Sequence, residues 1–180
     1  MLKQTGFLIL LSAGLSFCTP SKSISQLPQT DFSWANASYT IVISYSDECP
    51  FCIRYTAKIR EIRKSLPENW NFKLLKVLPE EQWDFDGIDE FSADIIHDST
   101  QSITKFLGIQ VYPEAVIVDS AANLVYKGAI DDRAHETGLS KTAVTTHYLD
   151  DAIARLSQGE KANEPFPLAK GCYIEFNEEN

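Results

Sequence analysis

Several features that often indicate function are missing from this sequence. It has no block rich in Lys or Arg, and its net charge is −9, which argues against a nucleic-acid ligand and against an electrostatic attachment to anionic lipid. It contains no internal repeat and no long low-complexity tract. Only Cys49 and Cys52 form a close cysteine pair, so a four-cysteine zinc site, which needs two such pairs, is disfavoured. The hydrophobic fraction of 44% is sufficient for the core of one ordinary domain.

Residues 1–17 have the pattern of an export signal. Lys3 supplies a positive start, and the apolar stretch that begins at Phe7 is too brief for a comfortable membrane span. The segment ends at Cys18 and resembles a bacterial lipoprotein signal, in which the cysteine is lipidated and becomes the mature N-terminus. We therefore predict an exported bacterial protein of the periplasm or cell envelope, attached to the membrane only through a lipid on Cys18.

The next segment, residues 18–36, is rich in Ser, Pro, Gln, Thr and Asn and predicts a flexible tether. A folded domain is expected over residues 37–180, with a C-terminal extension from about residue 160. Disulfides persist outside the cytosol, so the cysteine pair of an exported protein must be maintained by a partner rather than by cytosolic thiols.

The close cysteine pair lies where a predicted strand is followed by a predicted helix. The run 39–43 is apolar and β-branched, as in a buried strand. Apolar residues then recur at helical spacing, at Tyr55, Ile59, Ile62 and Leu66. The free N–H groups and the positive dipole end of a helix favour a thiolate, which makes Cys49 a candidate nucleophile near neutral pH. Cys52 lies within disulfide reach, so the pair can pass between dithiol and disulfide.

A purely structural bridge between Cys49 and Cys52 would close too small a loop to restrict the unfolded chain much, so redox chemistry is the favoured interpretation. Asp47 and Glu48 lie close to the first sulfur and should disfavour its thiolate. The intervening Pro50-Phe51 offers no cation and no side-chain donor to stabilise that thiolate. We therefore expect the pair to act as a reductant rather than as a strong oxidant.

The rest of the chain predicts an alternation of strands and helices. The expected elements are a strand at 71–78, an irregular or partly helical excursion at 80–92, a short strand at 93–97, a helix capped by Ser99 or Thr100 and stopped by Gly108, a hairpin of strands 115–118 and 124–127, and a closing helix over 144–156. Proline directly before a core strand removes a ladder donor, and a cis Tyr112–Pro113 bond beside the cysteines would explain it. The later run 131–133, Asp-Asp-Arg, is either a surface loop or a turn that flanks the site, and the surface loop is the favoured interpretation.

This order of elements resembles the thioredoxin fold over roughly residues 38–157. More narrowly, the chain resembles exported redoxins related to the alkyl-hydroperoxide-reductase/thiol-specific-antioxidant superfamily. The matching motifs are Glu48-Cys49-Pro50, His97-Asp98-Ser99-Thr100 leading to Leu107-Gly108-Ile109, Tyr112-Pro113-Glu114, the run from Tyr126 to Arg133, and Gly171-Cys172-Tyr173-Ile174. The resemblance implies an α/β, thioredoxin-like fold with a central mixed β-sheet flanked by helices.

By this resemblance, Cys49 is the attacking cysteine, Cys52 is its resolving partner, and Pro113 is the cis-proline that helps to hold an incoming chain. The residues expected to contact the substrate are Pro50, Phe51 and Tyr112. The expected enzyme is a thiol–disulfide oxidoreductase that works through a redox-active Cys49–Cys52 disulfide, with no other cofactor and no metal. Its partners would be a protein thiol or disulfide client and an upstream electron donor.

Three points remain open in the sequence: the role of Cys172, a peroxidase function and a copper-binding function. Cys172 is either inert, a partner for Cys49 as in two-cysteine peroxidases, or a second resolving thiol. A thiol peroxidase is favoured by Ser46, three residues before Cys49, although Val42 occupies the place of the upstream proline of peroxiredoxins.

The alternative from a different class is a Cu(I)-binding assembly protein, with Cys49, Cys52 and either His97 or His135 as soft ligands. His147 is expected to be exposed on the closing helix.

Overall fold

The computed structural model describes residues 34–77, 89–134 and 141–177, and its centre is a mixed β-sheet of five strands in the order β3-β2-β1-β5-β6. The strands are β1 (Tyr39–Ser44), β2 (Trp70–Lys76), β3 (Ile95–His97), β5 (Ala115–Asp119) and β6 (Leu124–Gly128). β1 runs parallel to β2 and antiparallel to β5. Its residues from Thr40 to Ser44 are buried, as expected for the central strand of a sheet covered on both faces. The predicted α/β class with a mixed sheet is confirmed.

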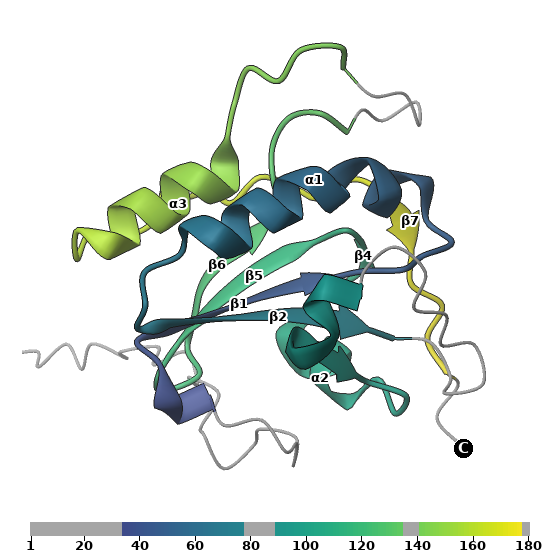
Figure 1. Ribbon diagram of the computed structural model, residues 1–180, viewed down its shortest axis with the longest axis horizontal. Coiled ribbons are helices and arrows are strands. Elements are labelled where there is room, and N and C mark those ends of the chain that lie inside the picture. The colour runs from purple at the N-terminus through teal and green to yellow at the C-terminus, as the bar shows by residue number, and fades with distance from the viewer. Residues whose placement is uncertain (1–33, 78–88, 135–140, 178–180) are drawn as a thin grey trace, which may run out of the picture.

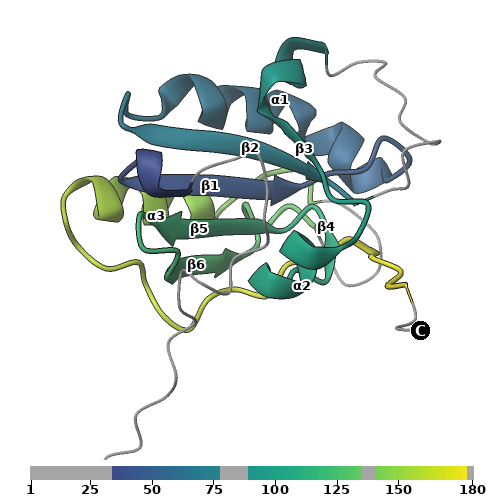
Figure 2. The same cartoon turned by 90° about the horizontal axis from the view of Figure 1, so that it is seen from below.

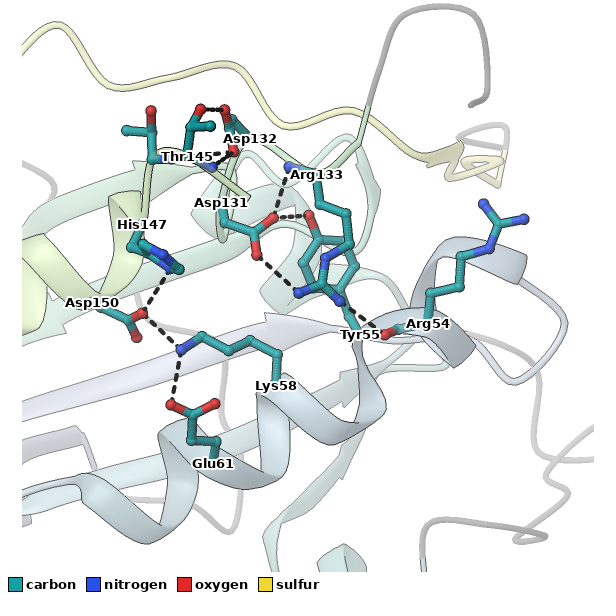
Figure 3. Close-up of polar contacts among 11 residues, drawn as sticks. Arg54, Tyr55, Lys58, Glu61, Asp131, Asp132, Arg133, Thr145, His147 and Asp150 are labelled. Carbon is teal, nitrogen blue, oxygen red and sulfur yellow. Dashed lines mark hydrogen bonds and ion pairs between the residues drawn. The ribbon is translucent and has the colours of Figure 1, made fainter. Parts of the chain in front are cut away.

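Helices cover both faces of this sheet (Figures 1 and 2). α1 (Pro50–Ser65) and α3 (Tyr148–Ser157) lie on one face, and α2 (Ser102–Leu107) lies on the other. The stripe of α1 that faces the sheet consists of Cys52, Tyr55, Ile59 and Ile62, in agreement with the helical spacing in the sequence. Lys58 of α1 forms an ion pair with Asp150 of α3 at 2.7 Å, which joins the two helices on their shared face (Figure 3).

A separate two-stranded sheet brings the end of the chain to the start of α1. β4 (Val111–Tyr112) pairs antiparallel with β7 (Cys172–Tyr173), with Tyr112 opposite Cys172. Figure 1 shows β7 beside the amino end of α1. Residues 172–177, which we call the C-terminal strap, therefore lie against the body of the domain. The sequence indicated a C-terminal extension from about residue 160 and, as one alternative, a bond between Cys172 and Cys49, but not the pairing of β7 with β4.

The helix boundaries differ from the prediction at two places. α2 begins at Ser102 with Gln101 as its N-cap residue, so the prediction that Ser99 or Thr100 caps it was wrong. The buried carboxylate of Asp98 instead accepts hydrogen bonds from Ile103 N at 3.2 Å and from Thr104 N at 2.7 Å. The two oxygens of the carboxylate each accept from one N–H group at the start of the helix, and the negative charge suits the positive end of the helix dipole. The closing helix begins at Tyr148, later than predicted.

Several predicted segments lie outside the described residues. These are the export signal with Cys18, most of the tether and most of the excursion at 80–92. Its last residues belong to a 3-10 helix (Asp89–Asp94), which also takes the first two residues of the strand predicted at 93–97. Within the part of the chain that the structure describes, no helix is both long and apolar enough to span a membrane.

Replacing Asp98 with alanine should lower the free energy of unfolding by about 3 kcal/mol, because the two buried N–H groups and the Thr104 hydroxyl lose their acceptor. Urea denaturation measures this change. Ser99→Ala is the matched control: Ser99 is exposed, and the loss should stay within about 0.5 kcal/mol. A larger loss of unfolding free energy for Ser99→Ala than for Asp98→Ala would show that Ser99 caps the helix.

Candidate redox site

Cys49 is the N-cap residue of α1, in the extended backbone conformation typical of that position. Pro50 follows at the first helical position, where the missing N–H costs no helical hydrogen bond, and Ile53 N donates to Cys49 O at 3.2 Å to close the first turn. The Cys49 sulfur therefore lies at the positive end of the helix dipole, as the strand-to-helix placement predicted. That position favours the thiolate form when the sulfur is reduced.

The disulfide in this structure joins Cys49 to Cys172, across 123 residues of chain and 6.1 Å between Cα atoms. Cys52 is a free thiol. The structure thus holds a different bond from the expected Cys49–Cys52 disulfide. The reason is geometric: the side chain of Cys52 points from α1 into the core and is fully buried, whereas β7 carries Cys172 alongside the end of the helix. Among the three interpretations of Cys172, the one that agrees with this bond is a partner for Cys49.

The Cys52 thiol is held in its neutral form. Burial raises its pKa to about 12, and the nearby Asp47 carboxylate adds to the rise, while a hydrogen bond from Ser46 N, at 3.4 Å, opposes it in part. A neutral thiol is a poor nucleophile, so in this conformation Cys52 is not prepared to attack a disulfide at neutral pH.

The protonation of Cys52 leads to a prediction about pH. An unfolded cysteine ionises near pH 9 and the folded one near 12, so the unfolded chain releases a proton first. The contribution of Cys52 to stability is therefore complete below pH 9 and is lost as the pH rises from 9 towards 12. Accordingly, iodoacetamide at pH 8 should leave Cys52 unmodified in the native protein and modify it in urea, as mass spectrometry of the peptides would show. Rapid native labelling at pH 8 would contradict the burial of this thiol.

The Tyr112–Pro113 peptide bond is cis, as predicted. The Cys49 sulfur lies 3.4 Å from the carbonyl oxygen of Tyr112, so main chain rather than side chain faces it. Ser44 holds this turn on both sides, because its hydroxyl donates to Val111 O at 2.7 Å and accepts from Glu114 N at 2.8 Å. Of the predicted substrate contacts, Pro50 is exposed, Phe51 is partly buried and Tyr112 is buried.

A buried lysine offsets the acidic residues that precede Cys49. Lys76, at the end of β2, is 1% exposed and forms an ion pair with Asp47 through Nζ. The carboxylate of Asp47 is thereby partly neutralised, which weakens its effect on the neighbouring sulfur, while Glu48 is exposed to solvent. Lys76 could not be recognised from the sequence, because it lies at the end of β2, 29 residues from Asp47. Glu114, which follows the cis-proline, accepts a hydrogen bond from Gln110 N at 2.8 Å and lies 3.7 Å from Lys127 Nζ.

The Asp-Asp-Arg run is not simply a surface loop, because Asp131 is 2% exposed. Its carboxylate accepts hydrogen bonds from the Tyr55 hydroxyl and, at 2.9 Å, from Arg133 N (Figure 3). The Arg133 guanidinium lies 5.2 Å from the centre of the Tyr55 ring and 3.6 Å from the second carboxylate oxygen. Burial and the adjacent carboxylate raise the pKa of Tyr55. A tyrosine in the buried stripe of α1 needs a polar partner, and this was the available signal in the sequence.

The second aspartate of the run has a different environment. Asp132 accepts hydrogen bonds from Thr145 N at 2.9 Å and from Lys141 Nζ at 2.6 Å, and the Lys141 ammonium holds the pKa of the Asp132 carboxyl below its usual range. These bonds attach residues 141–145 to the loop that carries Asp131. The cluster therefore fixes the segment after β6 against α1, one turn beyond Cys52.

Metal ligands do not converge in the described part of the chain: no group of three His, Cys, Asp or Glu residues there could hold an ion. His97 lies on β3, and His135 is outside the described residues. His147 is exposed, as predicted, and its Nδ1 lies 3.5 Å from an Asp150 oxygen.

A cleft of about 520 Å³ lies beside the disulfide. Its described lining consists of Ser46, Glu48, Cys49, Val77, Ser99, Gln101, Tyr112, Cys172, Tyr173, Glu175 and Asn177. No Arg or Lys is among these residues, so the described wall of the cleft is acidic.

The arrangement around this site identifies the fold. A mixed sheet in the order β3-β2-β1-β5-β6 carries a C-x-x-C motif at the start of the helix that follows its central strand, and a cis-proline precedes β5 beside the first cysteine. The fold is thioredoxin-like. As a result, the predicted fold class is confirmed.

Comparisons with solved structures agree with this fold. An uncharacterized conserved protein from Geobacillus kaustophilus matches with a TM-score of 0.66 and 19% identity, over 81% of this chain and 82% of its own. A hypothetical protein from Sinorhizobium meliloti matches with a TM-score of 0.62 and 20% identity, over 80% of this chain and 82% of its own. No protein-family model matches the chain, and no curated protein matches it in sequence.

Proposed function

We propose that this thioredoxin-like protein is a thiol–disulfide oxidoreductase in which Cys49 forms a transient mixed disulfide with a protein client. The observation that carries the proposal is the Cys49–Cys172 disulfide at the amino end of α1, beside the cis-proline. A sulfur in that position is activated by the helix, and the bond to Cys172 demonstrates that a second sulfur of the same chain comes within bonding range.

The proposed reaction proceeds through two exchanges. The Cys49 thiolate attacks a client disulfide, and one client sulfur leaves as a thiolate. The Cys172 thiolate then attacks the Cys49 sulfur, the second client thiol leaves, and the Cys49–Cys172 bond of the present structure remains. Each exchange breaks one S–S bond and forms another, and an upstream dithiol donor reduces Cys172 and Cys49 for the next cycle. Cys52, which the sequence indicates as the resolving cysteine, is buried and neutral in this state.

The site is proposed to act as a reductant. Strongly oxidising members of this chemical class have a stabilised thiolate, with potentials near about −120 mV, whereas reductants lie near about −270 mV. The carboxylates of Asp47 and Glu48 precede Cys49 and disfavour its thiolate, although the Lys76 ammonium partly offsets the charge of Asp47. Equilibration with a glutathione redox buffer tests this proposal, and a potential near the strongly oxidising value would overturn it.

The cellular setting is also a proposal. We infer from the residues 1–17 and from Cys18 that the protein is exported to the bacterial envelope and anchored there by lipid. The motifs from Glu48 to Ile174 support a relationship to the exported redoxins of the alkyl-hydroperoxide-reductase/thiol-specific-antioxidant superfamily. In that setting the client is a protein disulfide, and a membrane or envelope protein supplies the electrons.

A thiol peroxidase is the second candidate, because a two-cysteine peroxidase would leave the same Cys49–Cys172 bond. The cleft beside Cys49 argues against it, since its described lining carries Glu48 and Glu175 and no Arg or Lys that could polarise a peroxide. One experiment separates the two functions. The reduced protein is mixed in parallel with a disulfide-bonded protein and with hydrogen peroxide, and oxidation is followed by thiol counting. We expect the protein disulfide to react faster, and the reverse order would favour the peroxidase.

A further inference from the structure

The C-terminal strap covers the sulfur that a client must reach. Cys49 is 3% exposed in this state, and the strap extends along β4 directly beside it, with Tyr112 opposite Cys172. Beyond the paired residues, Ile174 N donates to Gln110 O at 3.0 Å, which continues the ladder. A client can therefore reach Cys49 only after the strap has moved away, and the edge of β4 then becomes free for another extended chain.

Besides the Cys49–Cys172 bond, the strap is held by its main chain and by the apolar side chain of Ile174. Tyr173 is 84% exposed and Glu175 is also exposed, so neither side chain is bound by the rest of the protein. Ile174, between them, is 6% exposed and packs into the core. Alternation of this kind is typical of a strand added to a sheet edge, where main-chain bonds supply affinity and every second side chain supplies specificity.

Gln101 binds the far end of the strap through the main chain alone. Its side chain is buried at 4% exposure, its Nε2 donates to Glu175 O at 2.7 Å, and its Oε1 accepts from Asn177 N at 2.7 Å. Because both partners are backbone groups, the amide would accept any extended segment in that register. When the strap leaves, both ends of this amide lose their partners and become available to water or to the main chain of another extended segment.

We propose that the strap is an internal substitute for the client, and that β4 and Gln101 form the track on which an extended client segment binds. The preferred segment carries a cysteine with an apolar residue two positions later, matching Cys172 and Ile174. This inference rests on the proposed exchange function. Reduction of the Cys49–Cys172 bond releases the strap, the client then occupies the track, and the returning strap both resolves the mixed disulfide and displaces the product.

A peptide with the sequence of residues 170–177 tests the track. Its cysteine is activated as a mixed disulfide with thionitrobenzoate, and the protein is the full chain with Cys18→Ser, Cys52→Ser and Cys172→Ser, so that Cys49 is its one remaining cysteine. The Cys49 thiolate attacks the peptide sulfur, a Cys49–peptide bond forms, and the coloured thionitrobenzoate anion leaves with the electron pair of the broken bond. Attack is directed to the peptide sulfur because thionitrobenzoate is the better leaving group. Dithiobis(nitrobenzoate) serves as the reference disulfide, because it has no peptide chain that could pair with β4.

The decisive result is that one substitution changes the rate of the peptide reaction in opposite directions when it is made in the peptide and when it is made in the protein. Ile174→Asp in the free peptide should lower the rate roughly tenfold, because the peptide loses its buried anchor. The same substitution in the protein should raise the rate with the unchanged peptide, because the tethered competitor is weakened. Tyr173→Ser in the peptide is the matched control at an exposed position and should change nothing. Methylation of the peptide nitrogen that corresponds to Asn177 N should lower the rate about fivefold, since it removes a bond to Gln101.

The outcomes separate this inference from the function on which it rests. If Cys49 reacts with neither the peptide nor dithiobis(nitrobenzoate), the exchange function fails. If it reacts with both, but Ile174→Asp has no effect or has the same sign in peptide and protein, the exchange function stands and the client track is overturned.

Discussion

Replacement of Cys49 by serine is expected to reduce disulfide exchange to the uncatalysed level and to leave Cys172 as a free thiol. A serine hydroxyl is neither ionised near neutral pH nor able to form a sulfur–sulfur bond, so the site at the start of α1 loses its chemistry while the helix keeps an N-cap residue. The measurement is the reduction of a disulfide-bonded protein by the reduced variant, together with a count of free thiols after oxidation.

The other two cysteine variants assign the resolving step. Cys172→Ser should still attack the client but accumulate the mixed disulfide, since no accessible thiol remains to release it. Cys52→Ser should still form the Cys49–Cys172 bond and release the client, because the Cys52 thiol is buried and its pKa is raised to about 12. Accumulation of the mixed disulfide in Cys52→Ser, with normal release in Cys172→Ser, would return the resolving role to Cys52.

Gly171→Ala should prevent the strap from pairing with β4. A Cβ atom at this position would lie 1.9 Å from the carbonyl oxygen of Tyr112 and 2.7 Å from its carbonyl carbon, which are both main-chain atoms beside the cis-proline. The strap would have to move, and Cys172 would move with it. We expect formation of the Cys49–Cys172 bond to slow by at least roughly tenfold, a change of about 1.4 kcal/mol in the barrier. Thiol quantification during oxidation measures this rate.

The matched control for that variant is Gly159→Ala. Gly159 has a positive φ of 76°, yet nothing lies within 4 Å of the added Cβ, so this substitution reports backbone strain without a clash. It should cost about 1 kcal/mol of stability and leave disulfide formation unchanged. Unchanged oxidation in Gly171→Ala, or equal slowing in Gly159→Ala, would show that close approach at Tyr112 does not position the strap.

The site could be predicted from sequence only as far as local signals extend. The start of α1 at the cysteine pair follows from a β-branched run, a proline at the first helical position and apolar residues at helical spacing. The cis bond at Pro113 followed from a proline directly before a core strand. The cap of α2 was missed because the first N–H groups of the helix donate to the carboxylate of Asp98. Asp98 precedes the two residues that the sequence indicated as caps.

The environment of the sulfur atoms could not be predicted in the same way. Lys76 lies 29 residues from Asp47, and Asp131 lies 76 residues from Tyr55. Each pair meets only because the order of strands in the sheet and the packing of α1 against it bring the residues together. Sequence spacing carries no information on such partners, and the prediction of a surface loop at Asp131 was wrong for this reason.

The sequence by itself determined the thioredoxin-like order of elements and the position of Cys49, because hydrophobic periodicity and helix-start chemistry act over a few residues. Only the tertiary structure decided which sulfur bonds to Cys49. Cys49 and Cys172 are 123 positions apart in the sequence, and they meet only because β7 pairs with β4. Cys52, three residues away in sequence, is directed into the core by the turn of the helix. Burial and strand pairing thus outweigh proximity along the chain.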